Sequence, residues 1–469
     1  MKRLLSWILP IAPLSMAYML QQFEYDTQKF AVWMLRYPSL WSVQRRGTFV
    51  STGRGRMLRW SALGIYVVWI LVVVVAAWGN PWYGLAILLS GLVTGYLLII
   101  LNAFMQICIV LPQQRREIAR ARQKLISMKD TKRIAVLGSY GKTSMKELLT
   151  TVLSEGLTVA ATPGNKNVLI SHARWIQRLA GDEDVLVIEY GEAAPGDIAR
   201  FAEYSQPDYA VVTGLAPAHL DQYPSLASIA RDFGAVQETV SSDNIWYNAH
   251  HELLRDVFAD AHAYGETKLG DMKVTDIEIA VTGTSFTVKR GKATTRYTTG
   301  LLGAHHIGPL LAVIAIAREL GLNEKQIQQG VAATIPYEHR MQPKSLLGAW
   351  IIDDAYNGNI EGMRAGLKLL MALPAKRRVY VTPGLVDQGV ETEAVHRELG
   401  QLIGEAGPDR VVLMQNAQTA WIQAGIAETS YSGEVVVEED PLAYYTGLEH
   451  HIAAGDVVML QNDLPDAYA

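Results

Sequence analysis

The sequence predicts an α/β protein in three parts: N-terminal transmembrane helices, a central α/β domain with a phosphate-binding P-loop, and a C-terminal Rossmann-like α/β domain. Three observations support this prediction. Residues 60–114 contain no Asp, Glu, Lys or Arg. After residue 130, short apolar runs alternate with amphipathic stretches, which is the pattern of parallel α/β units. The first of these runs leads into the glycine loop "GSYGKTS".

The uncharged stretch is long enough for two membrane spans, since one span needs about 20 apolar residues. We expect the spans at about 61–78 and 84–111, with the turn "GNPW" between them. Residues 4–23 are also uncharged, and the sequence leaves open whether they span a membrane or lie at its interface. Basic residues flank the stretch on both sides, which predicts a cell-membrane protein whose domains beyond residue 115 lie in the cytoplasm.

The remaining chain divides at changes in composition and pattern. The net charge of −4 leaves no cation excess for a nucleic-acid partner. A run that alternates with a period of two, residues 277–300, predicts a small antiparallel insertion, and a helical pattern follows at 305–321. The expected parts are a membrane region at 1–115, a basic linker at 116–130, a central nucleotide-binding domain at 131–335 and a C-terminal domain at 336–469.

Six apolar runs are the expected parallel strands of the two α/β domains. Three precede the antiparallel insertion and three follow it. Aspartates follow the first apolar run of the C-terminal domain, at the strand edge where α/β proteins collect ligands. The six runs are 133–138, 184–190, 208–214, 349–355, 377–382 and 410–415.

The loop "GSYGKTS" predicts a nucleotide-phosphate site. Glycines let backbone N–H groups close around phosphate oxygens, and the N-terminus of the following helix adds partial positive charge. A lysine in this place reaches the terminal phosphates of ATP, and the hydroxyl after it ligates Mg²⁺. The candidate residues are Gly138, Ser139, Gly141, Lys142, Thr143 and Ser144.

Further motifs follow in a fixed order: "TPGNKNVLIS", "VIEYGEAAPGDIARF", "APAHLDQYPSL", "LLGAHHIG", "HRM" and "IIDDAYNGNIEGM". Together with the short glycine loop, they resemble the Mur ligases, ATP-dependent amide-forming enzymes of peptidoglycan assembly. The resemblance covers about residues 131–463 and is greatest to the member that adds D-alanyl-D-alanine to a UDP-linked tripeptide.

The resemblance implies roles for residues outside the glycine loop. Glu189 ends an apolar strand, and with His219 it matches the family's metal ligands, while Arg340 matches an arginine that carries positive charge to the γ-phosphate. On the nucleotide side the matching positions are His306, Asp353, Asp354 and Asn357, and on the substrate side Thr162, Asn165, Asn167 and His396.

The chain also departs from the family pattern. The family places a carbamylated, metal-bridging lysine where this chain has Phe233, and a glutamate where it has Ala235, so the second Mg²⁺ site is in doubt. Asp232 is a neighbouring carboxylate that offers compensation. His306 and Pro309 replace the adenine-side asparagines. The family's UDP-binding first domain is absent, and the uncharged region stands in its place.

The resemblance implies a ligase that uses ATP and Mg²⁺ to join a cell-wall peptide precursor, UDP-linked or lipid-linked, to an amino acid or dipeptide beside a lipid bilayer. Three alternatives stay open. One is a poly-γ-glutamate-type synthetase, against which the complete "DDAYN" segment argues. Another is a membrane-hairpin ATPase or kinase of envelope assembly. The third is a nucleotide-binding scaffold without catalysis, which Phe233 suggests.

Overall fold

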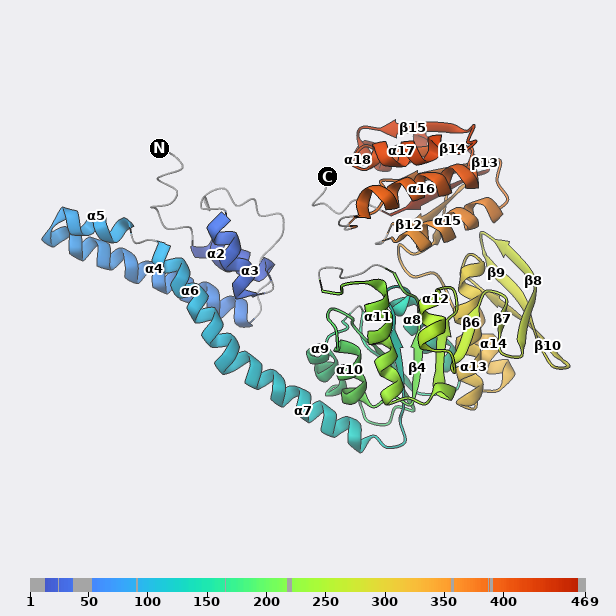
Figure 1. Cartoon of the computed structure of the whole chain (residues 1–469), viewed down its shortest axis with the longest axis horizontal. Coiled ribbons are helices and arrows are strands. Elements are labelled where there is room, and N and C mark those ends of the chain that lie inside the picture. The colour runs from blue at the N-terminus through green and yellow to red at the C-terminus, as the bar shows by residue number, and fades with distance from the viewer. Residues whose placement is uncertain are drawn as a thin grey trace. The chain divides into compact units, whose positions relative to one another are not determined.

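The computed structural model describes residues 13–23, 25–36, 53–89, 92–164, 166–216, 222–355, 358–386, 388 and 391–462. The chain forms two compact units, Met1–Ala119 and Arg120–Ala469, which are described separately (Figure 1). The predicted domain boundaries at 115, 130 and 335 stay predictions.

The described part of the first unit is helical. A small core of Leu20, Phe30, Leu58, Ala62 and Met105 holds several of its helices together. The helices are α2 (Pro13–Gln22), α3 (Thr27–Arg36), α4 (Gly53–Gly79), α5 (Pro81–Leu89), α6 (Leu92–Met105), the π-helix η2 (Gln106–Val110) and α7 (Leu111–Ser127), which continues into the second unit.

The structure describes the two expected membrane spans to different extents. Among the described residues, α4 is the one helix long and apolar enough to cross a membrane, and a single such helix is weak evidence. In the second expected span, 84–111, the described residues form part of α5, all of α6 and a π-helical segment, and residues 90 and 91 lie outside the described residues. The prediction of N-terminal transmembrane helices is therefore unconfirmed.

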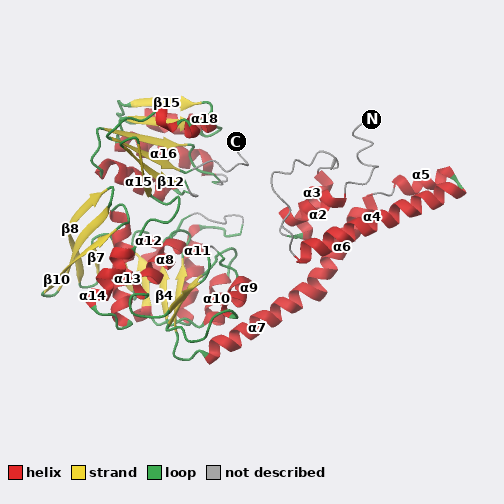
Figure 2. Ribbon diagram, turned by 180° about the vertical axis from the view of Figure 1, so that it is seen from behind, coloured by secondary structure: helices red, strands yellow, loops and turns green. Residues whose placement is uncertain are grey.

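The second unit contains a sheet of ten described strands in the order β10-β9-β8-β7-β6-β5-β4-β1-β3-β2. The strands from β2 to β6 in this order are parallel, as the alternating pattern predicted, and helices lie beside them (Figure 2). They are β1 (Lys132–Leu137), β2 (Val159–Ala161), β3 (Val185–Glu189), β4 (Tyr209–Val212), β5 (Ile245–Asn248) and β6 (His262–Gly265).

The central strands are buried on both faces, because apolar residues fill consecutive positions rather than alternate ones. One face packs on two helices whose apolar sides carry Leu149, Val152, Leu310 and Val313. The helices of this domain are α8 (Lys142–Leu153), α9 (Leu169–Ile176), α10 (Asp197–Ser205), α11 (Leu226–Gly234), α12 (Glu252–Val257), α13 (Ile307–Glu319) and α14 (Glu324–Ala333), with short 3₁₀ turns η3 (Ala235–Glu238), η4 (Ser242–Asn244) and η5 (Ala304–His306).

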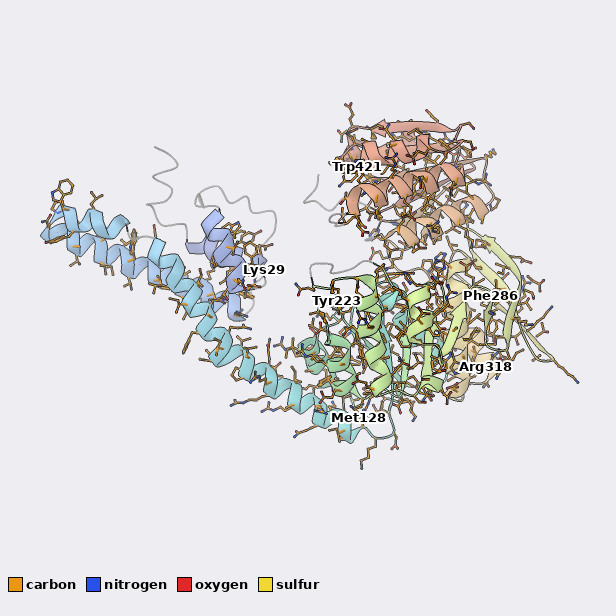
Figure 3. All side chains as sticks on the ribbon, in the orientation of Figure 1. Lys29, Met128, Tyr223, Phe286, Arg318 and Trp421 are labelled. Carbon is orange, nitrogen blue, oxygen red and sulfur yellow. The ribbon has the colours of Figure 1, made fainter. Side chains whose placement is uncertain are left out.

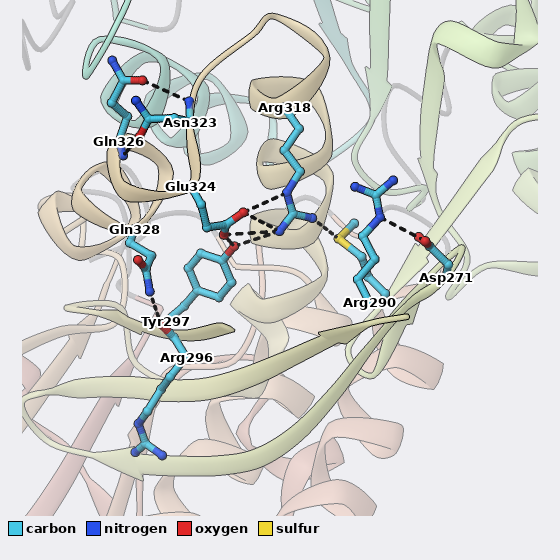
Figure 4. A network of polar contacts seen from close by, with 10 residues as sticks. Asp271, Arg290, Arg296, Tyr297, Arg318, Asn323, Glu324, Gln326 and Gln328 are labelled. Atoms are coloured by element: carbon cyan, nitrogen blue, oxygen red, sulfur yellow. Dashed lines mark hydrogen bonds and ion pairs between the residues drawn. The ribbon is translucent and has the colours of Figure 1, made fainter. Parts of the chain in front are cut away.

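The predicted antiparallel insertion extends this sheet as β7 (Lys268–Leu269), β8 (Met272–Ala280), β9 (Gly283–Arg290) and β10 (Ala293–Thr299). A polar network fixes it to the following helices (Figure 4). Arg318 of α13 lies 3.0 Å from Glu324 of α14, and its guanidinium also donates to the Tyr297 hydroxyl at 3.1 Å. The insertion is therefore an integral edge of the central sheet.

The C-terminal domain has its own sheet of six described strands, in the order β11-β12-β16-β13-β14-β15. All neighbours are parallel except the edge pair β11 and β12. The elements are β11 (Gln342–Leu346), β12 (Ala349–Asp354), α15 (Ile360–Ala372), β13 (Arg377–Thr382), α16 (Thr392–Ala406), β14 (Arg410–Met414), α17 (Thr419–Ala427), β15 (Glu434–Glu438), α18 (Pro441–Thr446), η7 (Leu448–His450) and β16 (Asp456–Gln461).

Candidate active site

The glycine loop connects β1 to α8 and has the backbone geometry that the sequence predicted. Gly138 has φ 139° and Gly141 has φ 80°, both in the region that glycine tolerates. A side chain at Gly138 would collide with Thr213, and Ser139 N donates to Gly214 O at 2.8 Å. The loop is therefore held against the end of β4, with the N-terminus of α8 directly behind it.

The ammonium group of Lys142 is held by the loop and by a carboxylate. Its Nζ donates to the carbonyl of Gly138, lies 3.5 Å from Ser139 O, and lies 2.8 Å from Glu192 Oε1. The lysine and glutamate side chains are only 11% and 5% exposed. The sequence did not single out Glu192, although it stands three residues after Glu189 at the end of the same strand.

Glu189, the last residue of β3, lies beside the hydroxyl of Thr143. Thr143 Oγ1 is 3.2 Å and 3.3 Å from the two carboxylate oxygens. Lys146, a fully buried lysine one turn further along α8, places its Nζ 3.1 Å from Glu189 Oε2 and also donates to Gly164 O. The sequence analysis missed Lys146; its spacing of four residues from Lys142, on the same helical face, was the available signal.

These groups suit one Mg²⁺ ion. Magnesium prefers oxygen ligands and is commonly held by one or two carboxylates together with substrate phosphates. The Thr143 hydroxyl and the Glu189 carboxylate provide such oxygens beside the phosphate loop. Among the described residues, however, no cluster of three or more His, Cys, Asp or Glu forms a ready-made metal centre.

The doubtful second metal position is filled by a core side chain. Phe233, near the end of α11, is completely buried. Asp232 does not supply a free carboxylate in its place, since its Oδ1 accepts from Gly196 N at 2.6 Å and its Oδ2 accepts from the Tyr223 hydroxyl at 2.9 Å. The described residues here do not fit a second cation bound as in the family pattern.

The predicted substrate residues lie in different settings. Thr162 is buried, and its Oγ1 accepts from Glu189 N at 3.0 Å, so it fixes the end of β3. Asn167 lies close to Gly191, just beyond that strand end. His396 is buried, with Nε2 accepting from Leu385 N at 2.9 Å and Nδ1 lying 2.6 Å from Thr392 O. Its burial, which lowers the pKa, and its backbone partners favour a structural role. Asn165, His219 and Asn357 lie outside the described residues.

Asp353 and Asp354 end β12 in the C-terminal domain and have different partners. Asp353 Oδ2 lies 2.6 Å from Lys344 Nζ and 2.9 Å from His339 Nδ1. Burial alone would raise the pKa of Asp353, but these hydrogen bonds outweigh it and hold the pKa below its usual value. Burial raises the pKa of Asp354 to about 6, against the opposing effect of Gln461, which donates to it at 2.8 Å.

The remaining predicted nucleotide residues are Arg340 and His306. Arg340 acts on the C-terminal pair, because its charge lowers the pKa of Asp354. His306 begins α13 as its N-cap, and its ring lies 4.0 Å from that of His305. Burial lowers the pKa of both histidines, so both rings are neutral near pH 7.

Comparisons with known proteins identify the family of this region. Residues 136–317 match the Mur ligase middle domain, and residues 339–461 match the Mur ligase glutamate ligase domain. This part of the chain therefore belongs to the Mur ligase family.

Several curated relatives carry the name UDP-N-acetylmuramoyl-tripeptide–D-alanyl-D-alanine ligase. The Escherichia coli protein is 30% identical over 290 residues, which cover 60% of this chain and 63% of the relative. The Mycobacterium leprae protein is 27% identical, with 70% of each chain covered. This chain thus spans less than two thirds of the length of the Escherichia coli relative.

Solved structures show the same fold. MurF from Thermotoga maritima in complex with ADP superposes with a TM-score of 0.65 and 22% identity, covering 75% of this chain and 80% of its own. MurF from Acinetobacter baumannii also has a TM-score of 0.65, with 20% identity and coverage of 74% and 77%. These likenesses establish the Mur ligase α/β fold of the middle and C-terminal domains.

The predicted location in the cell membrane is wrong on these findings. The relatives named above are ligases, two of them named for a UDP-linked precursor, and none of their names refers to a membrane. Among the described residues, α4 is the single helix that is long and apolar enough to cross a membrane, and one such helix is weak evidence. The absence of charged residues at 60–114 predicted apolar helices correctly, but it did not establish where in the cell the protein lies.

Proposed function

We propose that this protein is an ATP-dependent ligase that forms an amide bond on a cell-wall peptide precursor. ATP transfers its γ-phosphoryl group to a substrate carboxylate, which gives an acyl phosphate and ADP. The amine of the second substrate attacks the acyl carbon, phosphate leaves, and the nitrogen loses a proton as the amide forms. By similarity to the named relatives, the amine donor is D-alanyl-D-alanine or another amino acid or dipeptide.

The observation that carries this proposal is the arrangement of Lys142, Thr143 and Glu189 around the glycine loop. Loop N–H groups bind phosphate oxygens, and Lys142 neutralises charge that develops during phosphoryl transfer. Thr143 and Glu189 would hold Mg²⁺, and the bound ion would draw electron density from the phosphates. Arg340 and the aspartates at the end of β12 complete the nucleotide site from the C-terminal domain, a closure that gates the reaction.

The test is a ligation assay on the purified full-length chain. ATP, a UDP-linked tripeptide or its lipid-linked counterpart, and D-alanyl-D-alanine are incubated together, and the product is identified by mass spectrometry. We expect a product whose mass equals the two substrates minus one water, and phosphate release that requires both substrates. Product from the UDP-linked precursor alone excludes the lipid-linked acceptor. Phosphate release that does not depend on the amine donor contradicts the proposed ligase activity and favours an ATPase.

A further inference from the structure

Glu192 binds the lysine that the phosphate loop needs. The Lys142 ammonium contacts the carbonyl of Gly138, the carbonyl of Ser139 and the carboxylate of Glu192. The contact with Glu192, at 2.8 Å between two nearly buried side chains, is the one with a full opposite charge. Lys142 therefore cannot turn toward a phosphate without giving up its pairing with Glu192.

The loop has no spare cation to replace Lys142 in that pair. The second lysine of α8, Lys146, is already paired with Glu189 at 3.1 Å. Two lysines and two glutamates thus form two buried pairs, and their charges cancel. When a polyphosphate takes Lys142, Glu192 is left as a buried carboxylate without a partner, which is strongly unfavourable.

Further acids lie near Glu192 among the described residues. Tyr223, labelled in Figure 3, has its pKa raised first by burial, then by Asp232, and further by Asp197 and Glu192. The backbone that carries Glu192 is also fixed, because Gly196 N donates to Asp232 at 2.6 Å and Ala194 N donates to Asp197 at 2.9 Å. A cation that arrives with the ligand would relieve the charge of Glu192.

We propose that Glu192 makes nucleotide binding depend on the divalent cation. In the absence of Mg²⁺, Glu192 keeps Lys142 and repels the phosphates; with Mg²⁺, its carboxylate joins Thr143 and Glu189 as an oxygen ligand and Lys142 is released to the nucleotide. This deepens the proposed function and rests on it. It also accounts for a carboxylate at Glu192 in a chain that has Phe233 where the family pattern expects a metal-bridging group.

The test measures binding of a non-hydrolysable ATP analogue by titration calorimetry, in Mg²⁺ and in EDTA, for the wild type and for Glu192→Gln. We expect the wild type to bind about 100-fold more tightly with Mg²⁺, a coupling within the usual range. In Glu192→Gln the ratio falls by about tenfold or more, mainly because binding in EDTA becomes tighter. Mn²⁺, followed by its EPR signal, should bind the nucleotide complex of the variant about tenfold more weakly.

The matched control is Glu147→Gln, which removes a carboxylate from α8, the helix that carries Lys142. Glu147 lies 3.9 Å from Lys146 and its side chain is 45% exposed, so neither the Mg²⁺ ratio nor Mn²⁺ affinity should change. Circular dichroism and thermal unfolding show whether each variant is folded. If Glu192→Gln does not fold, Glu192→Asp replaces it, because a carboxylate one methylene shorter should still weaken Mn²⁺ binding about tenfold.

The outcomes separate the two proposals. A wild type that binds no nucleotide in either buffer overturns both the proposed function and the role of Glu192. A wild type that binds nucleotide, together with a Glu192 variant whose Mg²⁺ ratio and Mn²⁺ affinity match the wild type, overturns the role of Glu192 alone. A lowered ratio and weaker Mn²⁺ binding, with an unaffected Glu147→Gln, support it.

Discussion

Glu189 and Asp354 occupy corresponding places in two different sheets, each as the last residue of a parallel strand. Glu189 has a buried lysine at 3.1 Å. Asp354 has neutral donors, Gln461 Nε2 at 2.8 Å and Met341 N at 3.1 Å, and burial raises its pKa to about 6. Topology brings acids to the same edge of both sheets, but the neighbouring side chains decide whether each acid is held as an ion pair or approaches neutrality.

Removing the lysine beside Glu189 is the most severe test of this difference. Lys146→Met leaves a buried carboxylate without its cation, so we expect a loss of about 3–5 kcal/mol of unfolding free energy. Urea denaturation at pH 7 measures it, with Glu147→Gln as the surface control. A loss below about 1 kcal/mol would show that Glu189 does not depend on Lys146.

Changing the other lysine of α8 should affect function most. Lys142→Ala removes the charge that we propose for binding the phosphates, and we expect phosphate release in the ligation assay to fall by about 10²–10³-fold. The measurement is the initial rate under saturating ATP, with Lys289→Ala, an exposed lysine of β9, as the comparison. Undiminished turnover in Lys142→Ala would remove the phosphate loop from the mechanism.

Asp354 should make stability depend on pH in the opposite direction from an ion-paired acid. Its folded-state pKa of about 6 exceeds the unfolded value, so the native state binds the proton more tightly. Unfolding free energy should therefore fall by about 3 kcal/mol as pH rises from about 4 to about 6, and then level off.

Asp354→Asn tests that dependence directly. The variant should lack this part of the pH profile and gain about 1–2 kcal/mol at pH 8, because one of the two donors to Asp354 loses its acceptor and reduces the benefit. Denaturant unfolding at several pH values measures both chains. Parallel profiles of the wild type and the variant would contradict the raised pKa.

The smallest effect on stability is expected from the ion pair of Asp353 with Lys344. Its pKa is lowered by Lys344 and His339 despite burial, so its contribution to stability is present above the unfolded pKa and is lost as pH falls through the lower folded value. Lys344 is half-exposed, and Lys344→Met should cost at most about 1 kcal/mol at pH 7. A larger loss in thermal or urea unfolding would mean that this pair is worth more than an exposed one.

The sequence was most informative where the signal is local. The glycine loop, the strand before it and the acid at the end of β3 stand where the residue pattern placed them, because turn conformation and strand burial depend on neighbouring residues. The strand β16 was missed, although it lies between β12 and β13 in the second sheet. The pairing of β16 with β12 joins segments that are about a hundred residues apart in the sequence, and a short sequence pattern cannot predict such a pairing.

The sequence by itself determined the family, the phosphate loop and the antiparallel extension of the central sheet. Each of these features depends on adjacent residues or on motifs in a fixed order. Only the tertiary structure decided which polar groups meet: Lys142 with Glu192, Lys146 with Glu189, and Asp232 with Tyr223. Ion pairs and hydrogen bonds of this kind depend on distances of a few ångströms between separate elements, and folding alone fixes those distances.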